Sequence, residues 1–68
     1  MSLRDRLLDR AHRYADEAML AEKSAEAAME IGDHDLAAEL YMGAHDLRSK
    51  AAAYHERLSI LERIRRKG

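Results

Sequence analysis

Histidine is the residue type in this chain with the most evident capacity for chemistry, and it occurs four times, as His12, His34, His45 and His55. A helical zinc site needs histidine pairs one turn apart, and a di-iron bundle needs Glu-x-x-His pairs. No two histidines stand four residues apart, and Asp9-x-x-His12 is a single approximation to the second pattern. We therefore expect solvated histidines, no metal site and no cofactor.

The chain has few of the residues that nucleophilic catalysis requires. The chain has no cysteine and no threonine, and none of its serines stands in a glycine elbow. No glycine-rich phosphate loop is present either. We expect no catalytic residue and predict that the protein is not an enzyme.

The charged residues are unevenly distributed. Residues 1–13 and 57–68 hold nine Arg and Lys against three Asp and Glu, a net charge of +6, and residues 14–56 hold three against ten, a net charge of −7. If the two ends of the chain lie together, one end of the molecule is basic. The simplest explanation of this charge distribution is that it complements the helix dipoles and keeps the protein soluble. The functional explanation is an anionic partner or antiparallel self-pairing. The candidate partner site at this basic end consists of Arg4, Arg6, Arg10, Arg13, Arg57, Arg63, Arg65, Arg66 and Lys67.

The composition predicts an all-α domain. The 68 residues include no proline and three glycines, and the β-branched residues are limited to Ile31, Ile60 and Ile64. No apolar run approaches the roughly 20 residues of a membrane span, and the N-terminus lacks a signal-peptide core. Together with the absence of cysteine, this leads us to expect a cytoplasmic protein without a membrane partner.

Start and stop signals divide the chain into two helices. Ser2 is a good N-cap, with Asp5 three residues later, and Gly32 is typical of a helix C-terminus. Asp33 follows as the N-cap of a second helix. The sequence predicts one domain over 1–68, with a helix over 2–31, a turn at 32–33 and a helix over 34–66.

Each predicted helix carries an apolar seam whose members alternate at spacings of four and three. If the chain folds back at Gly32 with Ala28 opposite Ala37, Ala25 falls opposite Leu40, and most large residues face an alanine. We therefore expect a long antiparallel hairpin. The two seams are Leu7, Ala11, Tyr14, Ala18, Ala21, Ala25 and Ala28, then Ala37, Leu40, Ala44, Leu47, Ala51, Tyr54, Leu58 and Leu61.

Many apolar residues fall outside the seams, where a lone hairpin leaves them in water. A chain this short with an alanine-rich seam also needs more buried surface than one hairpin supplies. We expect a homodimer that forms a four-helix bundle, and a heterologous protein partner is the alternative. The candidate interface consists of Leu8, Met19, Leu20, Met29, Leu36, Tyr41, Ile60 and Ile64.

Residues 21–44 resemble a tetratricopeptide repeat. The small residues, the turn glycine and the aromatic of that pattern correspond to Ala25, Gly32, Ala37, Tyr41 and Ala44. Ala28 replaces the usual aromatic before the turn, the usual later proline is missing, and both helices are about twice the repeat length. The resemblance implies hairpin packing and protein binding. The same stretch is similar to the helical extension beside Smr domains, through the shared "GD…A.EL" core.

One resemblance points to an enzyme instead. Arg48 followed seven residues later by His55 resembles the nuclease motif of HEPN ribonucleases. Those domains are longer and have more helices than this chain can form.

The sequence favours a non-enzymatic protein–protein interaction module, a small adaptor, chaperone-like or regulatory protein that acts as a dimer of helical hairpins. The alternative is a Rop-like nucleic-acid-binding regulator that uses the basic end. The net charge of −1 and the lack of an aromatic residue among the arginines of that end speak against it.

Overall fold

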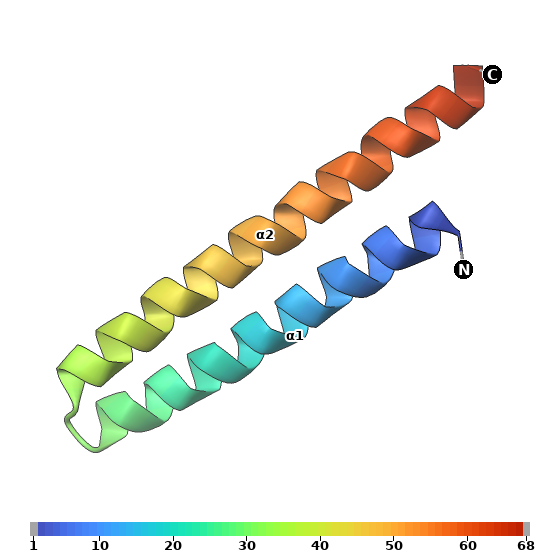
Figure 1. Cartoon of the computed structure of the whole chain (residues 1–68). Coiled ribbons are helices and arrows are strands. Elements are labelled where there is room, and N and C mark those ends of the chain that lie inside the picture. Colours follow the sequence, from blue (N-terminus) through green and yellow to red (C-terminus); the bar gives the residue numbers. More distant parts are fainter. Residues whose placement is uncertain (1, 68) are drawn as a thin grey trace.

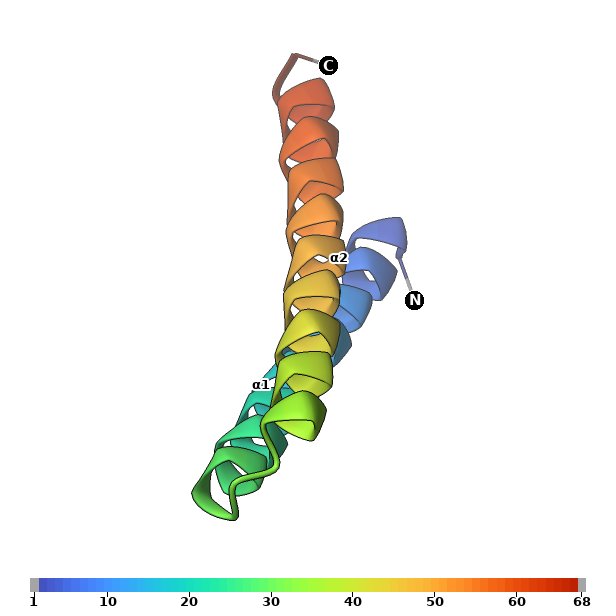
Figure 2. The same cartoon turned by 90° about the vertical axis from the view of Figure 1, so that its left-hand side faces the viewer.

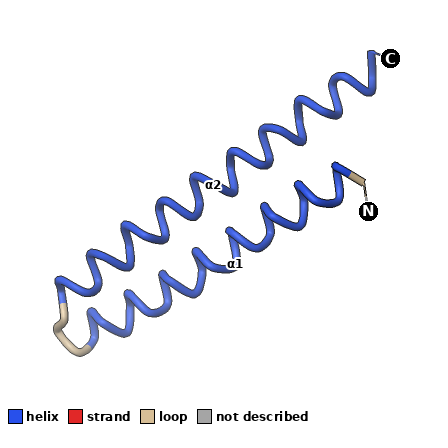
Figure 3. The backbone as a smooth tube through the Cα atoms, viewed as in Figure 1, coloured by secondary structure: helices blue, strands red, loops and turns tan. Residues whose placement is uncertain are grey.

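The chain folds as a long antiparallel hairpin of two helices, α1 (Leu3–Glu30) and α2 (His34–Lys67) (Figure 1). The computed structural model describes residues 2–67, the side chain of Lys67 excepted, and contains no strand within them. The molecule is a rod of 55 × 18 × 11 Å, and the loops within the described residues are the turn and a short stretch before α1 (Figure 3). The prediction of an all-α, two-helix hairpin is confirmed, and each helix end lies within one residue of its expected position.

The turn is built from the two residues that the sequence singled out. Gly32 has a φ of +82°, which an L side chain rarely adopts. Its N–H donates to the carbonyl of Met29 at 3.1 Å, and the N–H of Asp33 donates to the carbonyl of Ala28 at 2.9 Å, which together form a Schellman motif. The Asp33 carboxylate then accepts from the N–H of Leu36 at 3.2 Å and caps α2.

The start of α1 has its own cap. The Ser2 hydroxyl accepts a hydrogen bond from the N–H of Asp5 at 3.2 Å, and the acidic side chain of Asp5 lies in the first turn of the helix, where the dipole favours it.

The two helices pack mainly through alanines. Methyl side chains keep the two backbones close, and the helices cross at a shallow angle (Figure 2). Among the described residues, no large side chain is fully buried, so the core is thin. Every buried residue belongs to the predicted seam, as Ala11, Ala18, Ala25, Ala28, Ala37, Ala44, Ala51 and Leu58.

Neither helix has a stretch apolar enough to span a membrane, as far as the described residues go.

Candidate interaction surfaces

The seam residues of each helix fall in two columns, and the large ones stand mostly in one of them. A repeat of three and four residues places alternate seam positions on either side of the contact line. In α2 one column is buried and holds Ala37, Ala44, Ala51 and Leu58, and the other is half-buried and holds Leu40, Leu47, Tyr54 and Leu61. In α1 one column holds the buried Ala11, Ala18 and Ala25. The other holds the half-buried Leu7, Tyr14 and Ala21 and ends at the buried Ala28.

The columns that hold the large residues lie on the same side of the contact line in both helices. The rod therefore has two unlike long faces. We call the face on the side of the large residues the leucine face. Its border residues are Leu3, Arg10, Glu17, Ser24 and Ile31 of α1 and Leu36, Gly43, Lys50, Arg57 and Ile64 of α2. The opposite face, here the histidine face, is bordered by Leu8, Ala15, Glu22 and Met29 of α1 and by His34, Tyr41, Arg48, His55 and Glu62 of α2.

Cross-helix contacts agree with this assignment of the two faces. On the histidine face, the guanidinium of Arg48 bonds to the carboxylate of Glu22, with Nε and Oε1 2.6 Å apart. On the leucine face, Lys50 Nζ lies 5.7 Å from the ring centroid of Tyr14. Each contact joins border or column positions that the helical repeat places on the same face.

The candidate interface residues divide between the two faces. Leu20, Leu36, Ile60 and Ile64 belong to the leucine face, and Leu20 and Ile64 are 64% and 63% exposed. Met19, Met29 and Tyr41 are exposed on the histidine face, where Leu8 is half-buried. One flat partner surface therefore cannot cover the whole set.

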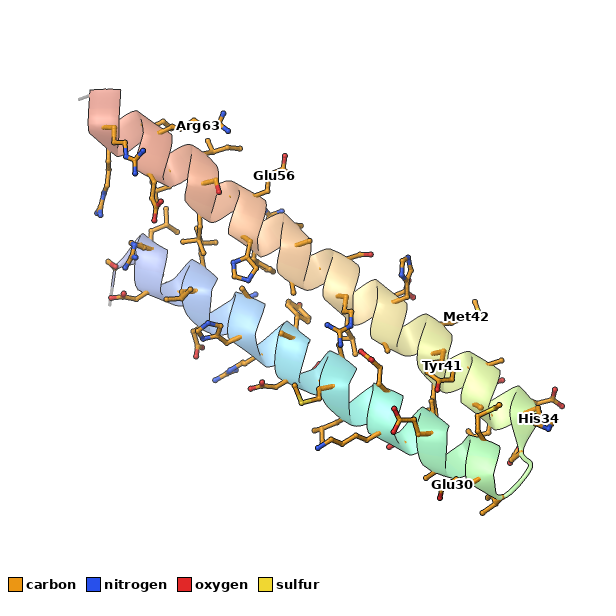
Figure 4. The ribbon with its side chains drawn as sticks, turned by 180° about the vertical axis from the view of Figure 1, so that it is seen from behind. Glu30, His34, Tyr41, Met42, Glu56 and Arg63 are labelled. Atoms are coloured by element: carbon orange, nitrogen blue, oxygen red, sulfur yellow. The ribbon has the colours of Figure 1, made fainter. Side chains whose placement is uncertain are left out.

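Sequence reasoning missed three further exposed apolar residues, Leu3, Ile31 and Met42. Leu3 and Ile31 lie at the two ends of α1 and belong to the leucine-face border. Extending the seven-residue repeat along that border would have identified both. Met42 lies on the outer edge of α2, together with Glu56 and Arg63, and all three point away from α1 in Figure 4.

The basic residues surround the open end of the rod and do not form a single patch. Arg6, Arg10, Arg13 and Arg57 belong to the leucine face, Arg66 to the histidine face and Arg63 to the outer edge of α2. Arg4 and Arg65 extend the seam beyond its last apolar layer, and the Lys67 side chain lies outside the described residues. Two of the arginines have acidic neighbours, since Arg4 lies 3.8 Å from Glu62 and Arg13 lies 3.4 Å from Asp9.

Two tyrosines lie among these cations, which corrects the expectation that no aromatic does. The rings of Tyr14 and Tyr54 stack with centroids 5.7 Å apart, and Arg57 lies over Tyr54 at 5.0 Å. Hydrogen bonding by the Arg10 guanidinium lowers the pKa of Tyr54 and raises the pKa of Arg10. This cluster was not predicted from the sequence, because Tyr14 and Tyr54 are forty positions apart and meet only across the hairpin.

A small open hollow beside the tyrosine stack is lined by Arg10, Arg13, Tyr14 and Glu17 and has a volume of about 180 Å³. Small-molecule sites usually enclose roughly 300–1,000 Å³. The hollow is part of a surface and does not have the dimensions of a buried ligand site.

All four histidines project from the histidine face or its outer margins. His34 Nδ1 lies 3.4 Å from the sulfur of Met29. Within the described part of the chain, no group of three or more His, Asp or Glu side chains is placed to hold a metal ion. In the Arg48 and His55 pair, the arginine is held by Glu22 of the other helix.

Comparison of the chain with protein-family models, with curated proteins and with solved structures finds no match.

The hairpin exposes more surface than a compact protein of its size. Its accessible surface is 5391 Å², whereas a folded monomer of 7.8 kDa typically exposes about 4,400 Å². The excess of about 1,000 Å² is comparable to the roughly 800 Å² that each partner buries in a standard protein interface.

The leucine-face side of α2 also carries a second stripe, at the same alternation of three and four residues as the seam. Gly43 lies in the middle of it, where a helical glycine costs about 1 kcal/mol relative to alanine. A Cβ added to Gly43 meets nothing within 4 Å, so packing inside the hairpin does not explain the glycine. The α2 stripe consists of Leu36, Glu39, Gly43, Asp46, Lys50, Ala53, Arg57 and Ile60.

Proposed function

We propose that the chain is a non-enzymatic protein–protein interaction module, a small adaptor, chaperone-like or regulatory protein, that works as a homodimer of hairpins in a four-helix bundle. The observation that carries this proposal is the thin alanine core beside a long face of half-buried and exposed leucines and isoleucines. Apolar surface of this extent is typical of sites that bind another protein. The resemblance of residues 21–44 to a tetratricopeptide repeat is consistent with the same kind of work.

A second copy is the simplest source of the missing buried surface. A four-helix bundle needs each helix to contact two neighbours, through two stripes roughly a quarter of a turn apart. Helix α2 has both stripes, since the seam faces α1 and the α2 stripe faces outward. The excess accessible surface has the size that one such contact buries.

Sedimentation equilibrium combined with thermal melting tests this proposal. The wild-type chain is expected to be a dimer at micromolar concentration, and its melting temperature is expected to rise with concentration. Ile60→Glu together with Ile64→Glu should shift the chain to monomer and lower its stability. Met42→Glu is the matched control, because Met42 is 70% exposed on the outer edge of α2. A chain that stays monomeric and folded from micromolar to millimolar concentration contradicts the homodimer and leaves these residues for a heterologous partner.

The Rop-like nucleic-acid-binding regulator is the second candidate, and the two tyrosines among the cations of the open half favour it. Bases stack on free aromatic faces, however, and here each ring is stacked on the other and has a cation over it. Binding of RNA or DNA that weakens steeply with salt would support this candidate. If the chain dimerises but binds neither RNA nor DNA at low salt, the second candidate is contradicted and the protein-interaction module remains.

A further inference from the structure

The charges of the α2 stripe reverse sign about its midpoint. Asp46 and Lys50 stand two residues on either side of Arg48, and Glu39 and Arg57 stand nine residues on either side of it. All four charged side chains are exposed in the hairpin. A stripe with this order is complementary to a second copy of itself that runs in the opposite direction.

The uncharged residues of the stripe obey the same reversal. Leu36 and Ile60 stand twelve residues on either side of the midpoint, and both are exposed. Gly43 and Ala53 stand five residues on either side. In an antiparallel pairing the apolar ends meet each other, and the two small residues allow the backbones to approach closely. This approach supplies the reason for Gly43 that the single hairpin lacks.

We propose that two copies of the chain pair through their leucine faces as an antiparallel two-fold dimer, with the α2 stripe of one copy on the α2 stripe of the other. The dyad lies across the rods at the height of Arg48, on the side of α2 opposite to that side chain. Asp46 of each copy pairs with the second copy's Lys50, and Glu39 with the second copy's Arg57. This inference rests on the proposed function, which it extends by naming the surface and the orientation.

Helix α1 is consistent with the same dyad without further adjustment. The seam register places Glu17 level with Arg48, and Glu17 lies on the leucine face, so the dyad passes beside Glu17. Rotation about it brings Leu3 opposite the second copy's Ile31, and Leu20 opposite the second copy's Tyr14. Glu17 meets its own counterpart, which is an unfavourable contact of the arrangement.

The histidine face lacks this self-complementarity. The same rotation on that face brings Leu8 opposite Glu26 and sets Arg48 against its own counterpart. A parallel dimer is also disfavoured, because it places two basic ends together and two acidic ends together. The leucine face in the antiparallel orientation is therefore the arrangement that the charges select.

Mixing two oppositely charged variants tests the pairing. Asp46→Lys alone and Lys50→Asp alone each set like charges against each other at both symmetry-related contacts, so each should weaken dimerisation at least about tenfold. An equimolar mixture should form a heterodimer at near wild-type affinity, because every contact is again opposite in sign. If the variants were instead weakened by repulsion within a single chain, mixing them would not restore dimerisation. Glu56→Lys, on the outer edge of α2, is the charge-matched control and should dimerise like the wild type.

Engineered cysteines test the position of the dyad, since the chain has no cysteine of its own. Glu17→Cys should form a disulfide-linked dimer on mild oxidation, whereas Asp16→Cys, at nearly the same height but turned outward, should not. A wild-type dimer in which mixing restores nothing and position 17 does not crosslink overturns this inference and leaves the proposed function standing. A wild-type chain that is monomeric by sedimentation overturns both.

Discussion

Tyr14 and Tyr54 stack across the two helices with their ring planes 19° apart, although forty positions separate them in the chain. Lys50 and Arg57 each lie over one of the rings, and the neighbouring Arg10 guanidinium lowers the pKa of Tyr54. The pair is the largest interruption in an otherwise aliphatic seam. It also gives the structure a spectroscopic signal that depends on the two helices being in register.

The titration of Tyr54 follows from this contact. The Arg10 guanidinium favours the phenolate, so the pKa of Tyr54 lies below its usual value of 10.0. As pH rises towards that value, the folded chain loses the proton before the unfolded chain does, and this group adds stability with rising pH over that interval. Ultraviolet absorbance over an alkaline pH titration should show the onset of this ionisation below the usual tyrosine value of 10.0. Arg10→Gln should move the ionisation of Tyr54 to higher pH, and Arg13→Gln should leave it unchanged.

The alanines of the seam should not tolerate larger side chains. Ala25 is completely buried, so Ala25→Leu should overpack the hairpin and destabilise it by about 1–3 kcal/mol. Glu26→Leu, one position later and exposed, serves as the matched control and should change stability little. Urea titration of both variants measures the free energies of unfolding. Equal losses would show that the seam is assigned to the wrong residues.

The left-handed backbone at Gly32 makes the turn sensitive to substitution. Gly32→Ala should cost about 1 kcal/mol, because a Cβ is strained at positive φ. Gly32→Asn should cost less, since asparagine tolerates this conformation better. Thermal denaturation of the two variants gives the ranking. Stabilisation by alanine would contradict the Schellman turn.

The ion pair between Glu22 and Arg48 should contribute little to stability. Both side chains are partly in solvent, and such pairs contribute about 0.2–1 kcal/mol, less at high salt. A double-mutant cycle with Glu22→Gln and Arg48→Gln measures the coupling. A coupling that is large and unchanged in 1 M salt would show that the pair is far better shielded from water than its exposure indicates.

The sequence by itself determined the hairpin, because its signals are local. A glycine that accepts positive φ, an aspartate that caps the next helix and a seven-residue repeat all act within a few residues of one chain segment. Gly32 and Asp33 therefore identified the turn, and Ala11, Ala18 and Ala25 identified the buried seam, without any knowledge of what lies opposite them.

Only the tertiary structure decided how the surfaces are divided. Met19 and Ile60 are both exposed apolar residues at different positions of the seven-residue repeat, and their separation onto opposite faces follows only once the neighbouring helix is placed against the seam. The same holds for the half-exposure of Leu40 and Leu47. It results from the close approach of two backbones across alanines, and this distance is set jointly by residues that are far apart in the chain.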